Sequence, residues 1–345
     1  MTRSRAAIRV LLVDDSGAAR AELGRILESD CGAEVVGAAA DGEQALREAQ
    51  RLRPDLVLLD LQMPRMDGFT FLRLLMARQP TPVVVLSARS RRTDVFKALE
   101  LGALDFVPKP EGDAPLDALR EALVEKCQLV RALRIENLAP RTAPAAAPGA
   151  GPAGIVALGA STGGPTAIQR LLSMLAGDLP LGFVVAQHMP ERFTGAFADR
   201  LARTTSFVAS EAAEGDVVAA GRVLVAPGGR HLEVRRGSDG VLRAAILPRA
   251  AAPGARYCPS ADVLFASVAR AAGSRACAIV LTGMGQDGRA GVGAVKRAGG
   301  LTLAESEDTA VVYGMPQAAA DSGAVDEVLA LPGIAARIRR FGGGH

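Results

Sequence analysis

The segment Gly159-Ala160-Ser161-Thr162-Gly163 matches the pattern G-x-S-x-G, which can present a serine hydroxyl as a nucleophile. An apolar run precedes the segment, and Pro165 follows it at the expected start of a helix. Flanking glycines permit a sharp turn, and a helix N-terminus stabilises developing negative charge. The same pattern also fits a phosphate-binding turn without chemistry, so Ser161 is a candidate nucleophile that needs a base.

The candidate base is His188, one of three histidines, of which His345 is terminal and His231 follows the turn Pro-Gly-Gly-Arg. His188 ends an apolar run, so we expect it at the carboxyl edge of a parallel sheet, on the same side as Ser161. Asp287 follows another apolar run, and a carboxylate there can orient the imidazole. A strand-end histidine can also be structural, and His231 fits a groove-lining or a structural role equally well.

A second group of chemical residues lies in the first third of the chain. Asp14 and Asp15 follow the first apolar run, and Asp60 follows the third. In a sheet of order 2-1-3-4-5 these strand ends are neighbours, and clustered carboxylates suit Mg²⁺. Ser87 and Lys109 end the fourth and fifth runs, where a hydroxyl and an ammonium can hold phosphoryl oxygens. The alternative is that the two adjacent aspartates only cap a helix.

The elements that would position these residues alternate regularly. Strand-like runs occur at 8–15, 33–40, 55–60, 82–88 and 105–110, with amphipathic stretches such as 43–52 and 93–102 between them. This alternation predicts a flavodoxin-like α/β domain with a five-stranded parallel sheet. Further strand-like runs follow at 154–161, 182–188, 221–227, 278–283 and 301–306, with helical stretches at 165–175, 260–272 and 290–299. They predict a second, doubly wound α/β domain.

Residues 138–154 are almost entirely Ala, Pro and Gly, a composition typical of a semi-stiff spacer. We therefore expect a first domain at 1–125, a helix end and linker at 126–153, and a second domain at 154–340. Two domains also agree with a length of 345 residues.

The composition excludes several classes of protein. A net charge of +3 argues against binding nucleic acid by bulk charge. Four scattered cysteines without a C-x-x-C pair exclude a zinc ribbon and argue against a disulfide scaffold. No apolar run approaches the roughly 18 residues of a membrane span. We expect a cytoplasmic protein that is not embedded in a membrane.

The first domain resembles the receiver domain of response regulators. The resemblance is carried by VDDS at 13–16, LLDLQMPRMDG at 58–68, Ser87, and DFVPKP at 105–110. It implies that Asp60 is the phosphorylated residue and that Asp14 and Asp15, with Asp60, hold Mg²⁺. It also implies that Ser87 and Lys109 sense the phosphoryl group.

The second domain resembles the effector domain of the chemotaxis protein-glutamate methylesterase (CheB) family. The matching segments are GASTGGP (159–165), QHMP (187–190), PGGRHL (227–232), YCPSADVLF (257–265), LTGMGQDG (281–288) and GMP (314–316). The resemblance implies a triad of Ser161, His188 and Asp287, with the backbone N–H of Met284 as oxyanion donor.

The two resemblances together imply a phosphorylation-regulated enzyme that hydrolyses glutamate γ-methyl esters on methyl-accepting chemotaxis receptors at the membrane. They also imply deamidation of specific receptor glutamines, a chemotaxis histidine kinase as phosphoryl donor, and an unphosphorylated receiver domain that restrains the esterase. No cofactor is expected for the ester hydrolysis itself.

Two other output functions stay open at this point. Residues 283–288 also match the dinucleotide-binding pattern G-x-G-x-x-G, and Glu305 follows at the spacing of a ribose ligand. A DNA-binding output would need a basic recognition helix, and no such helix stands out after the linker.

Overall fold

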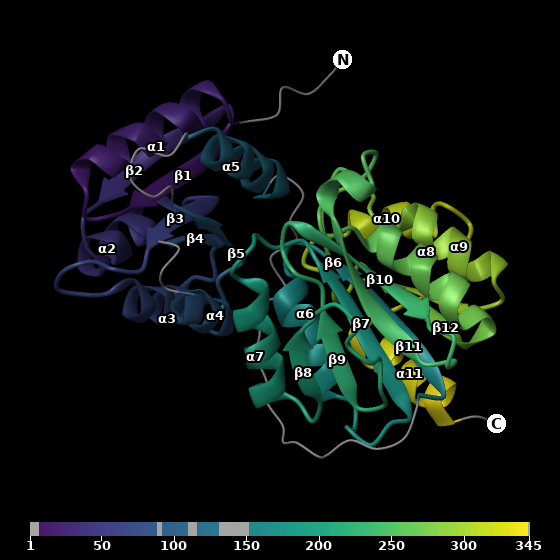
Figure 1. Ribbon diagram of the computed structural model, residues 1–345. Helices are drawn as coiled ribbons and strands as arrows, with labels where there is room; N and C mark the ends of the chain where they lie inside the picture. Colours follow the sequence, from purple (N-terminus) through teal and green to yellow (C-terminus); the bar gives the residue numbers. More distant parts are fainter. Residues whose placement is uncertain (1–6, 88–91, 110–115, 131–151, 344–345) are drawn as a thin grey trace. The chain divides into compact units, whose positions relative to one another are not determined.

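The chain divides into two compact units, Met1–Pro140 and Arg141–His345, whose elements are labelled in Figure 1. The computed structural model describes residues 7–87, 92–109, 116–130 and 152–343. The predicted linker at 126–153 lies mostly outside the described residues, and its bounds stay a prediction. The helix before it, α5, continues to Val130.

The N-terminal unit is built on a five-stranded parallel sheet with the order β2-β1-β3-β4-β5, which confirms the predicted architecture. Its strands are β1 (Ile8–Val13), β2 (Ala33–Ala39), β3 (Leu56–Asp60), β4 (Val83–Ser87) and β5 (Asp105–Pro108). Its helices are α1 (Gly17–Ser29), α2 (Gly42–Leu52), α3 (Gly68–Arg78), α4 (Arg92–Glu100) and α5 (Asp117–Val130). The four apolar residues of β3 are fully buried, as expected for a central strand of a parallel sheet. Asp60 therefore emerges at the carboxyl edge.

The C-terminal unit contains a seven-stranded parallel sheet with the order β14-β13-β12-β6-β7-β9-β8. Its strands are β6 (Gly154–Ala160), β7 (Leu181–Gln187), β8 (Val208–Glu211), β9 (Arg222–Val225), β12 (Ala276–Val280), β13 (Leu301–Glu305) and β14 (Glu327–Leu329). In the strand register, Ala160 pairs with Gln187, and Gly159 pairs with Val280. Strand β6 therefore lies between β7 and β12, and the loops that follow all three strands meet at one edge.

Helices and one hairpin cover this sheet. The helices are α6 (Gly164–Ser173), α7 (Thr194–Thr204), α8 (Ala261–Ala272), α9 (Arg289–Arg297), α10 (Met315–Ala320) and α11 (Leu331–Gly343). The hairpin is antiparallel and consists of β10 (Arg230–Arg236) and β11 (Leu242–Pro248). Among the described residues, no helix has the length and apolar character that a membrane span requires.

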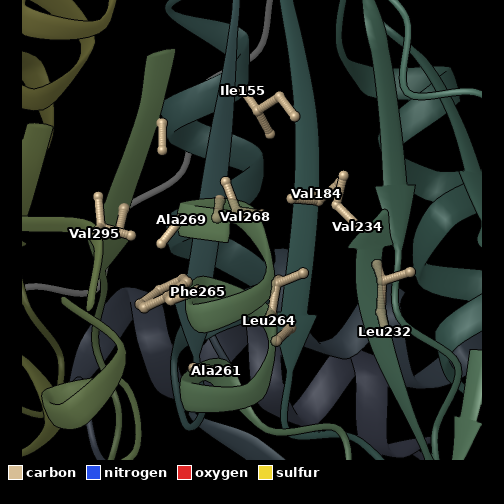
Figure 2. Packing of buried hydrophobic residues seen from close by; sticks show 14 of the residues in the cluster. Ile155, Val184, Leu232, Val234, Ala261, Leu264, Phe265, Val268, Ala269 and Val295 are labelled. Carbon is tan, nitrogen blue, oxygen red and sulfur yellow. The ribbon is translucent and has the colours of Figure 1, made fainter. Parts of the chain in front are cut away.

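Helix α8 is the central support of the site. Its buried apolar residues Ala261, Leu264, Phe265 and Val268 recur at helical spacing and therefore form one stripe (Figure 2). The stripe belongs to the same core cluster as residues of β6, β7 and β10. Burial of these side chains fixes the helix, and with it the position of its N-terminus at the carboxyl edge of the sheet.

Candidate functional site

Ser161 is buried and is the first residue after β6. Its backbone N–H donates to the carbonyl of Thr282 at 3.0 Å, and its own carbonyl accepts from the N–H of Gly164 at 2.9 Å. Gly163 adopts a φ of +77°, in the left-handed region that favours glycine, and caps α6. The predicted strand-turn-helix context of Ser161 is therefore present.

The loop after β12 packs directly on this turn. The hydroxyl of Thr282 donates to the carbonyl of Thr162 at 3.0 Å. A Cβ atom at Gly283 would lie only 2.7 Å from the Cβ of Ser161, so this position has no room for a side chain. The backbone N–H of the next residue, Met284, has no hydrogen-bond acceptor within the described parts of the chain. An unpaired backbone N–H next to the residue that packs on Ser161 is the kind of donor that an oxyanion requires.

His188 is the first residue after β7, and its backbone N–H donates to the carbonyl of Ala160 at 3.0 Å. Its Nε2 is hydrogen-bonded to the Oδ2 of Asp287 at 2.7 Å. The imidazole stacks on the ring of Tyr257, with centroids 4.1 Å apart and an interplanar angle of 13°. Its Nδ1 is buried and has no hydrogen-bond partner in the described structure, Ser161 included. Nδ1 is therefore the nitrogen available to take a proton.

Asp287 accepts an unusually large number of hydrogen bonds. Besides His188, its donors are the hydroxyl of Ser260 at 2.8 Å and the backbone N–H groups of Ala261 at 2.7 Å, Asp262 at 3.0 Å and Gly288 at 3.1 Å. Burial opposes ionisation of this carboxyl, but the hydrogen bonds from His188 and from the N-terminus of α8 outweigh it. The pKa of Asp287 is therefore lowered, and the side chain is an anion.

A pocket of about 690 Å³ opens beside these groups, and Tyr257, Arg256, Asp262, Gln286 and Asp287 contribute to its lining. The pKa of Asp262 is raised to about 6, first by burial and then by the neighbouring charge of Asp287. The pocket combines aromatic, cationic and acidic side chains and reaches the candidate triad at Asp287, whereas Ser161 and His188 do not belong to its lining. It is large enough to receive a side chain of another molecule.

The dinucleotide alternative does not fit this geometry. Glu305, the candidate ribose ligand, is fully buried, and its Oε2 accepts from the backbone N–H of Thr282 at 2.8 Å. Asp287, inside the G-x-G-x-x-G turn, is held by His188. Burial of Glu305 and the bond from Asp287 to His188 therefore disfavour ribose binding by either acidic group.

His231 is fully buried in β10, and neither ring nitrogen has a hydrogen-bond partner within the described residues. Burial lowers its pKa, so the ring is neutral. His231 does not line the pocket beside Asp287, and its groove-lining and structural roles both stay predictions.

The acidic residues of the N-terminal unit also converge. Carboxylate oxygens of Asp14, Asp15 and Asp60 lie within 4.8 Å of one another. Asp14 is fully buried, whereas Asp15 is exposed and Asp60 is half-buried. Ser16, not either adjacent aspartate, caps α1 by accepting from the N–H of Ala19, so the capping alternative is wrong. Three clustered carboxylate oxygens are a donor set that fits Mg²⁺ chemically.

Lys109 extends over this cluster. Its Nζ lies 2.7 Å from the Oδ2 of Asp14 and 2.5 Å from the Oδ2 of Asp60. Burial opposes its charge, but the two carboxylates dominate and raise the pKa of Lys109. The backbone of Ser87 ends β4 opposite Pro108, so it reaches the same sheet edge. The Ser87 side chain lies outside the described residues.

Several residues of the C-terminal site were not predicted individually. Tyr257 and Ser260 lie in the segment before α8, and Gln187 directly precedes His188. Each belongs to a segment that carried the family resemblance, but its role depends on contacts between segments far apart in sequence.

Comparison with known proteins identifies relatives of both units. Residues 156–338 match the family described as CheB methylesterase, and residues 10–121 match the response regulator receiver domain. The chain is 66% identical over 340 residues to protein-glutamate methylesterase/protein-glutamine glutaminase 6 of Anaeromyxobacter dehalogenans, covering 98% of this chain and 96% of that one. It is 48% identical over 346 residues to protein-glutamate methylesterase/protein-glutamine glutaminase 1 of Myxococcus xanthus, covering 98% and 99%.

A solved structure supports the fold of the C-terminal unit. The CheB methylesterase catalytic domain of Thermotoga maritima is 34% identical in sequence, with a TM-score of 0.51, and the match covers 54% of this chain and 97% of that one. With both units matched in the same order, the chain belongs to the CheB methylesterase family and carries a response regulator receiver domain at its N-terminal end.

Proposed function

We propose that the protein is a phosphorylation-regulated protein-glutamate methylesterase and protein-glutamine glutaminase, whose substrates are methyl-accepting chemotaxis receptors. The observation that carries the proposal is the His188–Asp287 pair at one sheet edge with Ser161, with the second imidazole nitrogen unpaired. Near-full-length identity to proteins of that name supports it.

The first half of the reaction forms an acyl-enzyme. Ser161 Oγ attacks the γ-carbonyl of a methylated glutamate while Nδ1 of His188 takes the hydroxyl proton. The Met284 N–H binds the oxyanion of the tetrahedral intermediate, an interaction worth about 3 kcal/mol. His188 then gives its proton to the departing methoxy group, which leaves as methanol.

The second half of the reaction restores the enzyme. His188 takes a proton from a water molecule, which attacks the acyl carbonyl. His188 then returns this proton to Ser161 Oγ as the bond between the serine oxygen and the acyl group breaks, which releases a glutamate side chain. Throughout, the anion of Asp287 stabilises the imidazolium and holds the proton on Nε2. A glutamine substrate follows the same path with ammonia as the leaving group.

The receiver domain supplies regulation. We propose that Asp60 accepts a phosphoryl group from a chemotaxis histidine kinase. Asp14, Asp15 and Asp60 would hold Mg²⁺, which would supply charge neutralisation for the phosphoryl group. Lys109, already paired with Asp60, and Ser87 then bind the phosphoryl oxygens. This chemistry would break the ion pair between Lys109 and the free Asp60 carboxylate, which offers a local trigger for activation.

Methanol release from methylated chemoreceptor membranes tests both the esterase activity and its regulation by phosphorylation. Wild-type protein should release methanol, Ser161→Ala should lose several orders of magnitude in rate, and acetyl phosphate with Mg²⁺ should stimulate wild type but not Asp60→Asn. Deletion of residues 1–150 should raise the unstimulated rate if the receiver domain restrains the esterase. Equal methanol release by wild type and Ser161→Ala would refute the assignment of the nucleophile.

A further inference from the structure

Gln187 connects the backbones of the nucleophile and the base. It is the last residue of β7 and is buried. Its side-chain Nε2 donates one hydrogen bond to the carbonyl of Ser161 at 2.8 Å and another to the carbonyl of His188 at 3.0 Å. Both amide hydrogens of this single side chain are therefore committed to the two residues that must exchange a proton.

The position of this bridge matters because the strand ladder has ended there. Ala160 and Gln187 are the last paired residues of β6 and β7, and Ser161 and His188 lie one step beyond them. One backbone hydrogen bond, from the His188 N–H to the Ala160 carbonyl, continues past the pair. Among the hydrogen bonds of the described residues, the remaining direct link between these two strand ends is the Gln187 amide.

The amide has a single usable orientation. If it were reversed, its oxygen would face two carbonyl oxygens, and all three are acceptors only. In the observed orientation Oε1 lies against Gly164, where an added Cβ would collide with it. The glycine at the start of α6 therefore makes room for the amide that fixes the nucleophile turn.

We infer that Gln187 is a positioning residue, which fixes the backbones of Ser161 and His188 relative to each other so that the Ser161 hydroxyl can approach His188 Nδ1 during the reaction. This inference rests on the proposed function and assigns its site one further residue. Gln187 does not touch the reacting atoms; it acts through the backbone of the two residues that do.

Replacement by methionine tests the bridge. Gln187→Met keeps a similar volume but has no donor, so the Ser161 turn can shift relative to the imidazole. Because a misplacement of about 1 Å can cost about 100-fold in rate, we expect kcat to fall about 100-fold with KM unchanged. The assay is methanol release by the full chain over a range of concentrations of methylated receptor membranes.

The matched control is Gln169→Met. Gln169 is also a buried glutamine, in α6, and its Oε1 pairs with Arg200 rather than with a predicted catalytic residue. We expect this variant to lose stability in thermal unfolding while keeping kcat. A similar kcat loss in both variants would overturn the inference, because general destabilisation would explain it.

Replacement by glutamate gives a readout that a purely structural role does not predict. A protonated carboxyl can donate one hydrogen bond to the carbonyls, whereas a carboxylate can donate none. Burial against two carbonyl oxygens raises the pKa of the introduced carboxyl. The kcat of Gln187→Glu relative to wild type should therefore be highest at acid pH and fall as pH rises. If the kcat ratio of Gln187→Glu to wild type did not depend on pH, the inference would be overturned. This test needs only the folded glutamate variant, so it remains possible if the methionine variant fails to fold.

Ser161→Ala separates this inference from the function on which it rests. If Ser161→Ala retains the wild-type rate, the proposed function fails. If Ser161→Ala is inactive while Gln187→Met retains the wild-type kcat, the proposed function stands and only the role of Gln187 is refuted.

Discussion

Asp287→Asn should change the proton position on His188. In the wild type, Oδ1 of Asp287 accepts from Ser260, Asp262 and Gly288, and Oδ2 accepts from Ala261 and His188. An asparagine can place its single oxygen where the first three donors converge. Its NH₂ group then faces Nε2 of His188, which must become an acceptor. The ring proton moves to Nδ1, the nitrogen that has to take the proton of Ser161.

The expected loss of kcat in Asp287→Asn follows from the loss of two effects, which are the correct tautomer and the anion that stabilises the imidazolium. Together these are worth about 10⁴-fold in kcat, or about 5 kcal/mol of transition-state stabilisation. The assay is methanol release from methylated receptor membranes at saturating substrate. A second effect should be visible by NMR titration, because removal of the Asp287 charge lowers the pKa of Asp262 from its value of about 6.

Asp262→Asn is the matched control for this experiment. Asp262 is a neighbouring, half-buried carboxyl, and its Oδ1 accepts from the N–H of Gly291 rather than from His188. We expect Asp262→Asn to keep kcat within about tenfold, since no catalytic proton depends on it. If folded Asp287→Asn also stayed within tenfold of wild type, the reasoning from tautomer and charge would be refuted.

Three further changes test the surroundings of the site. Burial raises the pKa of Glu305 to about 7 from its ordinary value of 4.5, so the folded state loses stability as pH rises between these values. Glu305→Gln should remove that loss, so its free energy of unfolding should rise relative to wild type by up to about 3 kcal/mol between pH 4.5 and 8. Urea unfolding measures this difference, and a difference that does not depend on pH would contradict the prediction. Gly283→Ala should cost about 1–3 kcal/mol and most of the activity because its Cβ meets that of Ser161, whereas a normal melting temperature and rate would refute the close packing. Phe265→Ala should cost about 3–5 kcal/mol in urea unfolding, since its ring is fully buried, and a loss below 1 kcal/mol would contradict its place in the core.

The regular alternation of strand-like and helical segments made much of the fold predictable. The first five strand-like runs each combine apolar continuity with a turn on either side, and their order in the sheet followed from the fold class. Strands β8 and β14 were missed because they are short and partly exposed. The β10–β11 hairpin was missed because its residues mix charged and apolar types, and its apolar face becomes meaningful only against α8.

The candidate site likewise has features that the sequence predicted and features that it did not. Strand-end positions placed Ser161, His188 and Asp287 at one edge, because parallel strands end together. The sequence contains no information on which imidazole nitrogen meets Asp287, since that depends on how the ring is held by Tyr257, about 70 residues away. The bridge made by Gln187 was missed for a related reason, because a glutamine at the end of an apolar strand has no distinctive pattern.

The most direct test of the account is a comparison of methanol release by Ser161→Ala, His188→Ala and the double variant. If the two side chains act as one unit, either single change should reduce kcat almost as much as both together, by roughly 10⁶-fold. If instead the two losses multiply in the double variant, or if His188→Ala remains active, Ser161 and His188 do not share a proton and the proposed mechanism is wrong.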